Sequence, residues 1–158
     1  MNRTGIGWDS HRLVAGRPLV LGGVRLESEV GLEGHSDADV LTHAVIDAVL
    51  GAAGLDDIGT HFPDTDPKFK DADSIALLEE SARLVAQAGF AVVNVDATVM
   101  LEAPKIGSHR AQMRERLATA LGLEPSQVNV KATTGEGMDA VGRGEGAAAI
   151  AVATLHPS

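Results

Sequence analysis

The 158-residue sequence contains no cysteine, no tyrosine, one tryptophan and three phenylalanines. Without cysteine there are no disulfide bonds and no thiolate metal ligands, so any metal ion must be bound by His, Asp or Glu. Aromatic residues make up 3% of the chain and the formal net charge is −9, so the chain lacks the stacking rings and basic face that nucleic-acid-binding proteins use. We therefore expect no nucleic-acid partner.

Long hydrophobic runs are also missing. The longest, from Ala147 to Ala153, is far shorter than the roughly 20 residues that a membrane-spanning helix needs. The N-terminal segment MNRTGIGWDSHRL contains no apolar stretch typical of a secretory signal. We expect a cytoplasmic protein with no membrane partner. The length and the hydrophobic content of 44% predict a single domain, residues 1–158, with a substantial core.

Segments with the apolar pattern of a strand and segments with that of a helix alternate along the chain. A β-hairpin is expected at 18–27, around Gly22 and Gly23, and the expected strands are 3–8, 90–101, 127–133 and 147–155. Helices are expected from about 35 to 54, at 74–88 and at 107–121. The last strand has no polar alternation, so we expect burial on both of its faces. These elements predict an α+β fold with helices on one face of a mixed β-sheet.

The first predicted helix carries a polar stripe on an otherwise apolar surface. Its N-terminus is expected to be capped by Ser36 or Asp37. Asp39, His43 and Asp47 lie four residues apart and therefore share one face. A metal would compensate their burial, with Asp39 or Asp47 accepting a hydrogen bond from the ring nitrogen of His43 that does not bind the metal. Alternatively, the stripe faces solvent and His43 is an ordinary surface histidine.

Asp9 and His11 offer two further ligands at the end of the first predicted strand. Residues two apart in an extended chain project to the same side. With His43 they give three N/O ligands, and an open fourth tetrahedral position is typical of catalytic zinc. The alternative for Asp9 and His11 is an exposed loop pair that binds no metal.

Two irregular segments are candidates for substrate binding. The acidic loop 56–73 is long, and long loops in compact domains are often functional. The glycine-rich loop 134–146 can bring backbone N–H groups close to phosphate, and Lys105 also suits an anionic ligand. Glu136 would repel phosphate unless it held Mg²⁺ or Mn²⁺. The alternatives are turn formation and a flexible loop. The third helix has an expected solvent-exposed face: Arg110, Arg114, Glu115 and Arg116.

Motifs spread over nearly the whole chain resemble the 2-C-methyl-D-erythritol 2,4-cyclodiphosphate synthase family of the non-mevalonate isoprenoid pathway. The matching segments are GWDSHRL, the GG at position 22, GHSDADVLTHAVIDAVLGAAGLDDIGTHFPDTDP, ADS, NVDATV, APK, VNVKATT and GRGEG. The resemblance implies conversion of 4-diphosphocytidyl-2-C-methyl-D-erythritol 2-phosphate into the 2,4-cyclodiphosphate and CMP, by attack of the 2-phosphate on the β-phosphate. It also implies a homotrimer with active sites between subunits.

The same resemblance implies roles for individual residues. Asp9, His11 and His43 would bind one Zn²⁺ per subunit, and Glu136 would bind Mg²⁺ or Mn²⁺ with the substrate diphosphate. His35 would be catalytic, with Thr134 as its partner near the diphosphate. Five of these six residues would also contact substrate, whereas His43 would bind only the metal. The other implied substrate-binding residues are Ser10, Ser36, Asp57, Ile58, Gly59, Phe62, Pro63, Asp64, Thr65, Asp66, Ala103, Pro104, Lys105, Ile106, Gly107, Ser108, His109, Ala132, Thr133, Gly135, Ala140 and Arg143.

Three positions depart from the family pattern, and several alternatives stay open. Gly135, Gly137 and Ala140 stand where Thr, Lys and Phe are usual, so we expect a less rigid loop. Arg143 could hold an isoprenoid diphosphate at the trimer axis, or form an intersubunit ion pair, for example with Glu145. A zinc-dependent phosphoester hydrolase would use a similar site. A non-catalytic metal-binding or scaffold protein is a further alternative.

Overall fold

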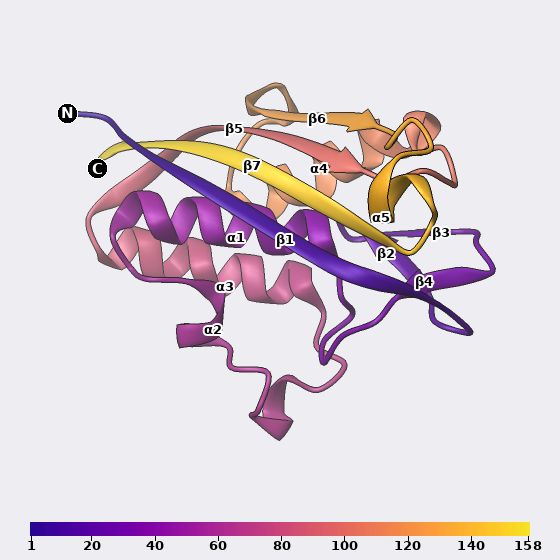
Figure 1. Cartoon of the computed structure of the whole chain (residues 1–158). Helices are drawn as coiled ribbons and strands as arrows, with labels where there is room; N and C mark the ends of the chain where they lie inside the picture. Colours follow the sequence, from indigo (N-terminus) through magenta and orange to yellow (C-terminus); the bar gives the residue numbers. More distant parts are fainter.

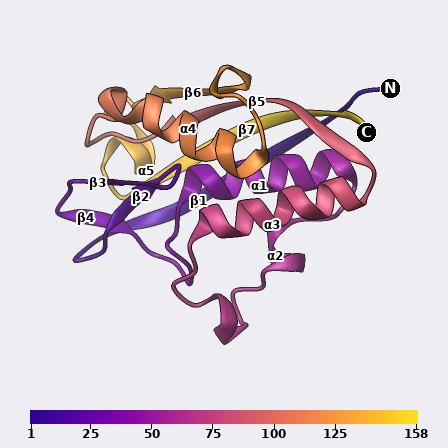
Figure 2. The ribbon, with the colours of Figure 1, turned by 180° about the vertical axis from the view of Figure 1, so that it is seen from behind.

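A five-stranded mixed sheet forms one layer of the molecule, and helices cover one of its faces (Figures 1 and 2). The computed structural model describes residues 1–158. The strand order is β4-β1-β7-β5-β6, in which β5 and β6 are parallel and the other neighbours antiparallel. The strands are β1 Arg3–Ala15, β4 Val30–Leu32, β5 Phe90–Met100, β6 Val128–Thr133 and β7 Gly146–Pro157. The predicted α+β fold is confirmed.

The long helices are α1 Val40–Ala53, α3 Ser74–Gln87 and α4 Arg110–Leu121. Helix α1 packs directly on β1 and β7, α4 packs on β6, and α3 packs on both helices, as Figure 2 shows. No helix combines the length and the apolar character needed to cross a bilayer. The smaller elements are the hairpin strands β2 Leu19–Leu21 and β3 Val24–Leu26, the helices α2 Ile58–His61 and α5 Asp139–Gly142, and the 3-10 helices η1 Pro67–Phe69, η2 Gly107–His109 and η3 Pro125–Gln127.

Glycine and alanine let α1 lie unusually close to β1. A Cβ atom at Gly7 would lie 1.9 Å from the carbonyl oxygen of Ala44, and one at Gly5 would lie 2.1 Å from that of Ala48. No other residue fits these two strand positions unless α1 moves away. The contact therefore sets the depth of α1 over the strand that carries Asp9.

The substitution Gly7→Ala should destabilise the protein strongly. We expect the free energy of unfolding to fall by about 3 kcal/mol, the upper end for overpacked cores, because the clash is with backbone and cannot be relieved by a rotamer change. Urea denaturation measures it. Gly107→Ala is the matched control, since a Cβ there meets no atom within 4 Å. Equal unfolding midpoints for the two variants would contradict this packing argument.

Strand β1 is longer than predicted. It continues to Ala15, pairing with β7 from Arg3 to Arg12 and with β4 from Leu13 to Ala15, and it places Asp9 opposite Ala149 and His11 opposite Ala147. Asp9 and His11 therefore lie within the strand, and their predicted place at its end is wrong. They still project to the same side, because their spacing of two matches the strand period.

Strand β7 is buried on only one face of this chain. Ala149, Ala151 and Ala153 are buried, whereas Val152 between them is 40% exposed. The prediction of burial on both faces is therefore wrong for the isolated chain, because helices cover one side of the sheet only. The open side carries an apolar stripe of three residues: Ile6, which is 65% exposed, Trp8, which is 58% exposed, and Val152.

The N-cap of α1 is Asp39, and the predicted caps Ser36 and Asp37 lie before it. The Asp39 carboxylate accepts hydrogen bonds from the backbone N–H and the hydroxyl of Thr42, and from the backbone N–H groups of Gly22 and Gly23. Complete burial and the charge of Asp37 raise the pKa of Asp39, whereas these donors favour its ionised form. Asp39 therefore ties the turn of the β2–β3 hairpin to the start of α1.

Candidate functional site

Asp9, His11 and His43 converge on one point. Asp9 Oδ2 lies 2.9 Å from His11 Nε2 and 3.1 Å from His43 Nδ1. One ligand atom from each residue can be chosen so that all three lie within 4.8 Å of one another. Two of the residues come from β1 and the third from the first turns of α1, which the close helix–strand contact brings together. The arrangement can hold a metal ion.

The outer hydrogen bond of His11 leaves its inner nitrogen available to a metal. Its Nδ1 lies 2.9 Å from the carbonyl oxygen of Glu33, which can only accept, so Nδ1 carries the proton. Its Nε2 is buried and has no well-aligned hydrogen-bond partner, although Asp9 is close. A buried ring nitrogen in this state fits a metal ligand.

Asp9 and His11 shift each other's pKa. Burial disfavours the charged form of Asp9, but its contacts with His11 and His43 outweigh burial and lower the pKa of Asp9. Burial also disfavours the protonated ring of His11, but the contact with Asp9 and its negative charge raise the pKa of His11. A metal must therefore displace a proton that His11 holds more tightly than an ordinary histidine does.

We expect metal affinity and metal-free stability to respond oppositely to pH. As the pH rises through the raised pKa of His11, protons stop competing and zinc affinity increases. In the metal-free protein, protonated His11 contributes fully to the free energy of unfolding below the ordinary histidine pKa. This contribution is lost as the pH rises through the raised pKa of His11. The Asp9 contribution is lost only as the pH falls through its lowered pKa. Zinc titrations by calorimetry in two buffers of different ionisation enthalpy should show that zinc binding releases protons. If no protons were released at about pH 6, His11 would not be the group that zinc deprotonates.

The predicted partners of His43 are wrong. Asp39 is the helix cap, and Asp47 accepts a hydrogen bond from the backbone N–H of Ile58. Burial raises the pKa of Asp47 and outweighs the Ile58 hydrogen bond, which favours the ionised carboxylate. Instead, His43 Nε2 lies 2.8 Å from Ser74 Oγ and 3.2 Å from Ser36 Oγ. Helical spacing correctly placed the stripe on one face but could not identify partners from distant segments.

A cavity of about 470 Å³ opens beside these three convergent side chains. His35 lies in its wall, and its Nε2 lies 2.9 Å from the carbonyl oxygen of Asp66. Phe62 and Phe69 pack edge to face at 5.5 Å and anchor the acidic loop to the core. Sequence reasoning missed three of the lining residues, Gly34, Phe69 and Leu77. The full lining is Asp9, His11, Gly34, His35, Ser36, His43, Ile58, Gly59, Phe62, Pro63, Asp64, Phe69 and Leu77.

Three predicted residues of the acidic segment do not line this cavity. Asp57 caps α2 by accepting hydrogen bonds from the backbone N–H and hydroxyl of Thr60, and these bonds lower the pKa of Asp57. Asp66 caps η1. Thr65 lies between the loop residues that do line the cavity and this cap. The structure thus gives Asp57 and Asp66 loop-shaping contacts.

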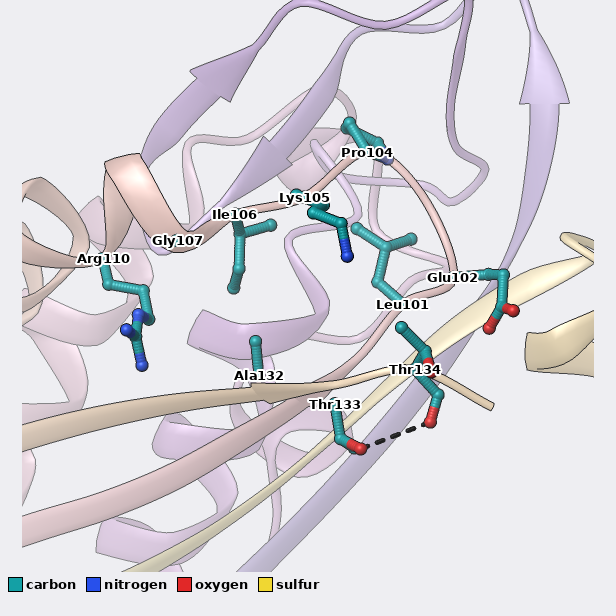
Figure 3. Close-up of a pocket in the computed structure, with 10 residues that line it drawn as sticks. All are labelled: Leu101, Glu102, Pro104, Lys105, Ile106, Gly107, Arg110, Ala132, Thr133 and Thr134. Carbon is teal, nitrogen blue, oxygen red and sulfur yellow. Dashed lines mark hydrogen bonds between the residues drawn. The ribbon is translucent and has the colours of Figure 1, made fainter. Parts of the chain in front are cut away.

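A second cavity, of about 240 Å³, lies between the segment after β5 and the end of β6 (Figure 3). Lys105 and Arg110 lie on one side of it and Ala132 and Thr133 on the other. Arg110 was expected to face solvent only, so this prediction is wrong. Leu101 and Glu102 were also missed, and three predicted residues do not line the cavity: Ala103, Ser108 and His109. The full lining is Leu101, Glu102, Pro104, Lys105, Ile106, Gly107, Arg110, Ala132, Thr133 and Thr134.

Glu102 holds the glycine-rich loop that follows β6. Its carboxylate accepts hydrogen bonds from the backbone N–H groups of Gly135, at 2.8 Å, and Gly137, at 3.1 Å. Glu136, between them, has a φ of 53°. A Cβ at Gly135 would lie 2.5 Å from the backbone nitrogen of Gly142. Glycine at 135 therefore permits close packing within the loop and does not leave it unsupported.

Three further predicted residues, Ser10, Ala140 and Arg143, line neither cavity. Ser10 and Ala140 line a groove of about 530 Å³ beside Trp8. Arg143 forms an ion pair with Glu145 of the same chain at 3.0 Å. The two cavities described above share no lining residue, so His35 and Thr134 belong to separate cavities of one chain.

Comparison with known proteins gives matches over the whole chain. Residues 2–156 match the model of the YgbB family. A 2-C-methyl-D-erythritol 2,4-cyclodiphosphate synthase from Desulfosudis oleivorans is 63% identical over 153 residues, which cover 97% of this chain and 91% of that protein. The bifunctional IspDF from Campylobacter jejuni has a TM-score of 0.96 at 43% identity, covering 100% of this chain and 43% of that one. IspF from Plasmodium falciparum in complex with CDP has a TM-score of 0.87 at 31% identity, covering 99% and 97%.

Proposed function

The chain belongs to the YgbB family, and from this premise we propose that it converts 4-diphosphocytidyl-2-C-methyl-D-erythritol 2-phosphate into 2-C-methyl-D-erythritol 2,4-cyclodiphosphate and CMP. The 2-phosphate attacks the β-phosphorus, a new P–O bond closes the ring, and CMP leaves. The observation that carries the proposal is the convergence of Asp9, His11 and His43 on one point of a cavity. The relatives give no support to a hydrolase.

Asp9, His11 and His43 would hold one Zn²⁺ per chain, which supplies Lewis-acid stabilisation of phosphate charge when bound. The carbonyl of Asp66 orients His35, which with Ser36 would bind substrate phosphate. A phosphate dianion is already a nucleophile, so the residues need only align it and offset its charge. The cavity walls Ile58, Gly59, Phe62, Pro63 and Asp64 would enclose the methylerythritol part.

The second cavity would hold the cytidine part. One relative is solved as a CDP complex, and this cavity combines apolar walls with Lys105, Arg110 and the hydroxyls of Thr133 and Thr134. Cations and hydroxyl donors suit a diphosphate. Glu136, on the loop that follows, would bind Mg²⁺ or Mn²⁺ with that diphosphate.

The active protein would be a homotrimer with each active site between two chains. One substrate must reach both sets of residues, and the two cavities of a single chain have no residue in common. The open apolar stripe of Ile6, Trp8 and Val152 offers a surface for neighbouring chains. Arg143 would lie near the axis. Its ion pair with Glu145 supports a structural role over binding of an isoprenoid diphosphate, which would need Glu145 to release it.

Mass spectrometry of the products tests the function. Incubation of the zinc-loaded protein with the cytidine substrate should yield cyclic diphosphate and CMP in equal amounts. Linear phosphates would instead support the hydrolase. Failure to bind CMP in calorimetry would support a metal-binding scaffold.

The substitution Glu136→Gln should weaken the dependence on Mg²⁺ without affecting zinc. We expect the Mg²⁺ concentration needed for half-maximal activity to rise about tenfold, because a neutral amide is a poorer ligand for a hard cation. Zinc content should be unchanged, since Glu136 is not among the three convergent residues. Glu115→Gln, on the exposed side of α4, is the control. An unchanged Mg²⁺ requirement would contradict the role.

A further inference from the structure

We propose that Ser74 and Asp37 form a hydrogen-bond relay that fixes the proton of His43 on Nε2 and so presents Nδ1 to the metal. The proposal rests on the metal centre described above. His43 Nε2 lies 2.8 Å from Ser74 Oγ, and the Ser74 hydroxyl makes a short contact with Asp37 Oδ1. A carboxylate can only accept, so Ser74 donates to Asp37 and its oxygen accepts from His43 Nε2–H.

Asp37 is held firmly in this accepting role. Its Oδ2 accepts a hydrogen bond from the backbone N–H of Ser74 at 3.0 Å, and its Oδ1 accepts one from that of Asp39 at 3.1 Å. The backbone N–H of Asp37 donates to the carbonyl of Ala72. Asp37 therefore joins the segment before α1 to the first residue of α3. Because Ser74 is fully buried, water does not compete for its hydroxyl.

Ser36 is the weaker partner of the same nitrogen. Its Oγ lies 3.2 Å from His43 Nε2 and already accepts a hydrogen bond from the backbone N–H of Ala38. No carboxylate contact is formed by the Ser36 hydroxyl among the hydrogen bonds of this site. The shorter, carboxylate-supported contact with Ser74 therefore determines which nitrogen keeps the proton.

Two carboxylates compete for the His43 proton from opposite sides of the ring. Asp9 Oδ2, 3.1 Å from Nδ1, favours a proton on Nδ1, where it would block metal binding. Asp37, acting through Ser74, favours the proton on Nε2. A metal can bind Nδ1 only when the second influence prevails, so Ser74 and Asp37 are positioning residues for the centre.

Zinc affinity, measured by competition with a chelator, tests the relay. We expect Ser74→Ala to lower the affinity by about 10- to 100-fold, the usual effect of losing a partner of a metal-bound histidine. Ser81→Ala is the matched control. Ser81 is a fully buried serine on the same helix whose hydroxyl donates to the carbonyl of Leu77 and does not touch His43. Its zinc affinity should equal that of the wild type.

The outcomes separate the relay from the metal centre itself. Wild-type protein that binds no zinc would overturn the centre. Wild-type binding with equal affinity in Ser74→Ala would overturn the relay alone. A second measurement needs no variant: ¹⁵N spectra of zinc-loaded wild-type protein should show His43 coordinated through Nδ1 and protonated on Nε2. Coordination through Nε2 would overturn the proposal even if Ser74→Ala failed to fold.

Discussion

Replacing His43 with alanine is expected to abolish cyclisation and to reduce zinc content sharply. His43 is the only one of the three convergent residues that comes from α1, and its loss leaves two ligands on β1. Catalytic zinc sites use three protein ligands. A Lewis acid is worth several kcal/mol of transition-state stabilisation, so the rate should fall by about a thousandfold or more. Steady-state product formation and elemental analysis measure the two effects.

The fold should survive this change, because α1 keeps its Asp39 cap and its alanine contacts with β1. His156→Ala is the control. Its ring lies on the exposed end of β7, hydrogen-bonded only to the carbonyl of Pro157. That variant should keep the zinc content and activity of the wild type. Full zinc content and activity in His43→Ala would remove the basis of the proposed function.

The spacing of the candidate metal-site residues could be predicted even though their surroundings could not. A separation of two puts Asp9 and His11 on one side of any extended chain, whether or not the strand ends there. The strand was expected to stop at Trp8 because polar residues follow. It continues because β7 pairs with it as far as Arg12 and β4 pairs with its last three residues. A pattern within one segment carries no information about its pairing partner.

The acidic residues of α1 show a similar limit. Helical periodicity correctly put Asp39, His43 and Asp47 on one face. Their partners, however, are the Gly22–Gly23 turn, Ser74 and Ile58, all distant in sequence. Both carboxylates accept hydrogen bonds from backbone N–H groups of loops. His43 is therefore hydrogen-bonded to a buried serine and not to either carboxylate. No local pattern distinguishes such a serine from the similarly buried Ser81.

The lack of polar alternation in β7 predicted two buried faces, and one of them is open in a single chain. Exposed Val152 and half-buried Ile150 and Thr154 alternate with buried alanine, and Val152 pairs across to Ile6 on the same side. An apolar strand beside open solvent is explained if another copy of the chain covers it. On this proposal, the missing polar alternation describes the strand in an assembly and not in the single chain.

Accordingly, Val152→Asp is expected to prevent the proposed trimer from forming and to abolish activity while zinc stays bound. The carboxylate is solvated in a monomer but would be buried without a partner in an apolar interface, at a cost of several kcal/mol for each copy. All three convergent residues come from one chain, so a monomer should retain its zinc. Light scattering, elemental analysis and product formation measure the three properties.

The matched control is Ala76→Asp, which places the same charge at an exposed position of α3. That variant should remain trimeric and active, because α3 lies on the helical side of the sheet. A fully active monomer of Val152→Asp would contradict active sites shared between chains. Loss of activity together with retained zinc would instead mean that the metal centre is complete in one chain. The nucleotide part of the substrate would then have to bind in the cavity of a neighbouring chain.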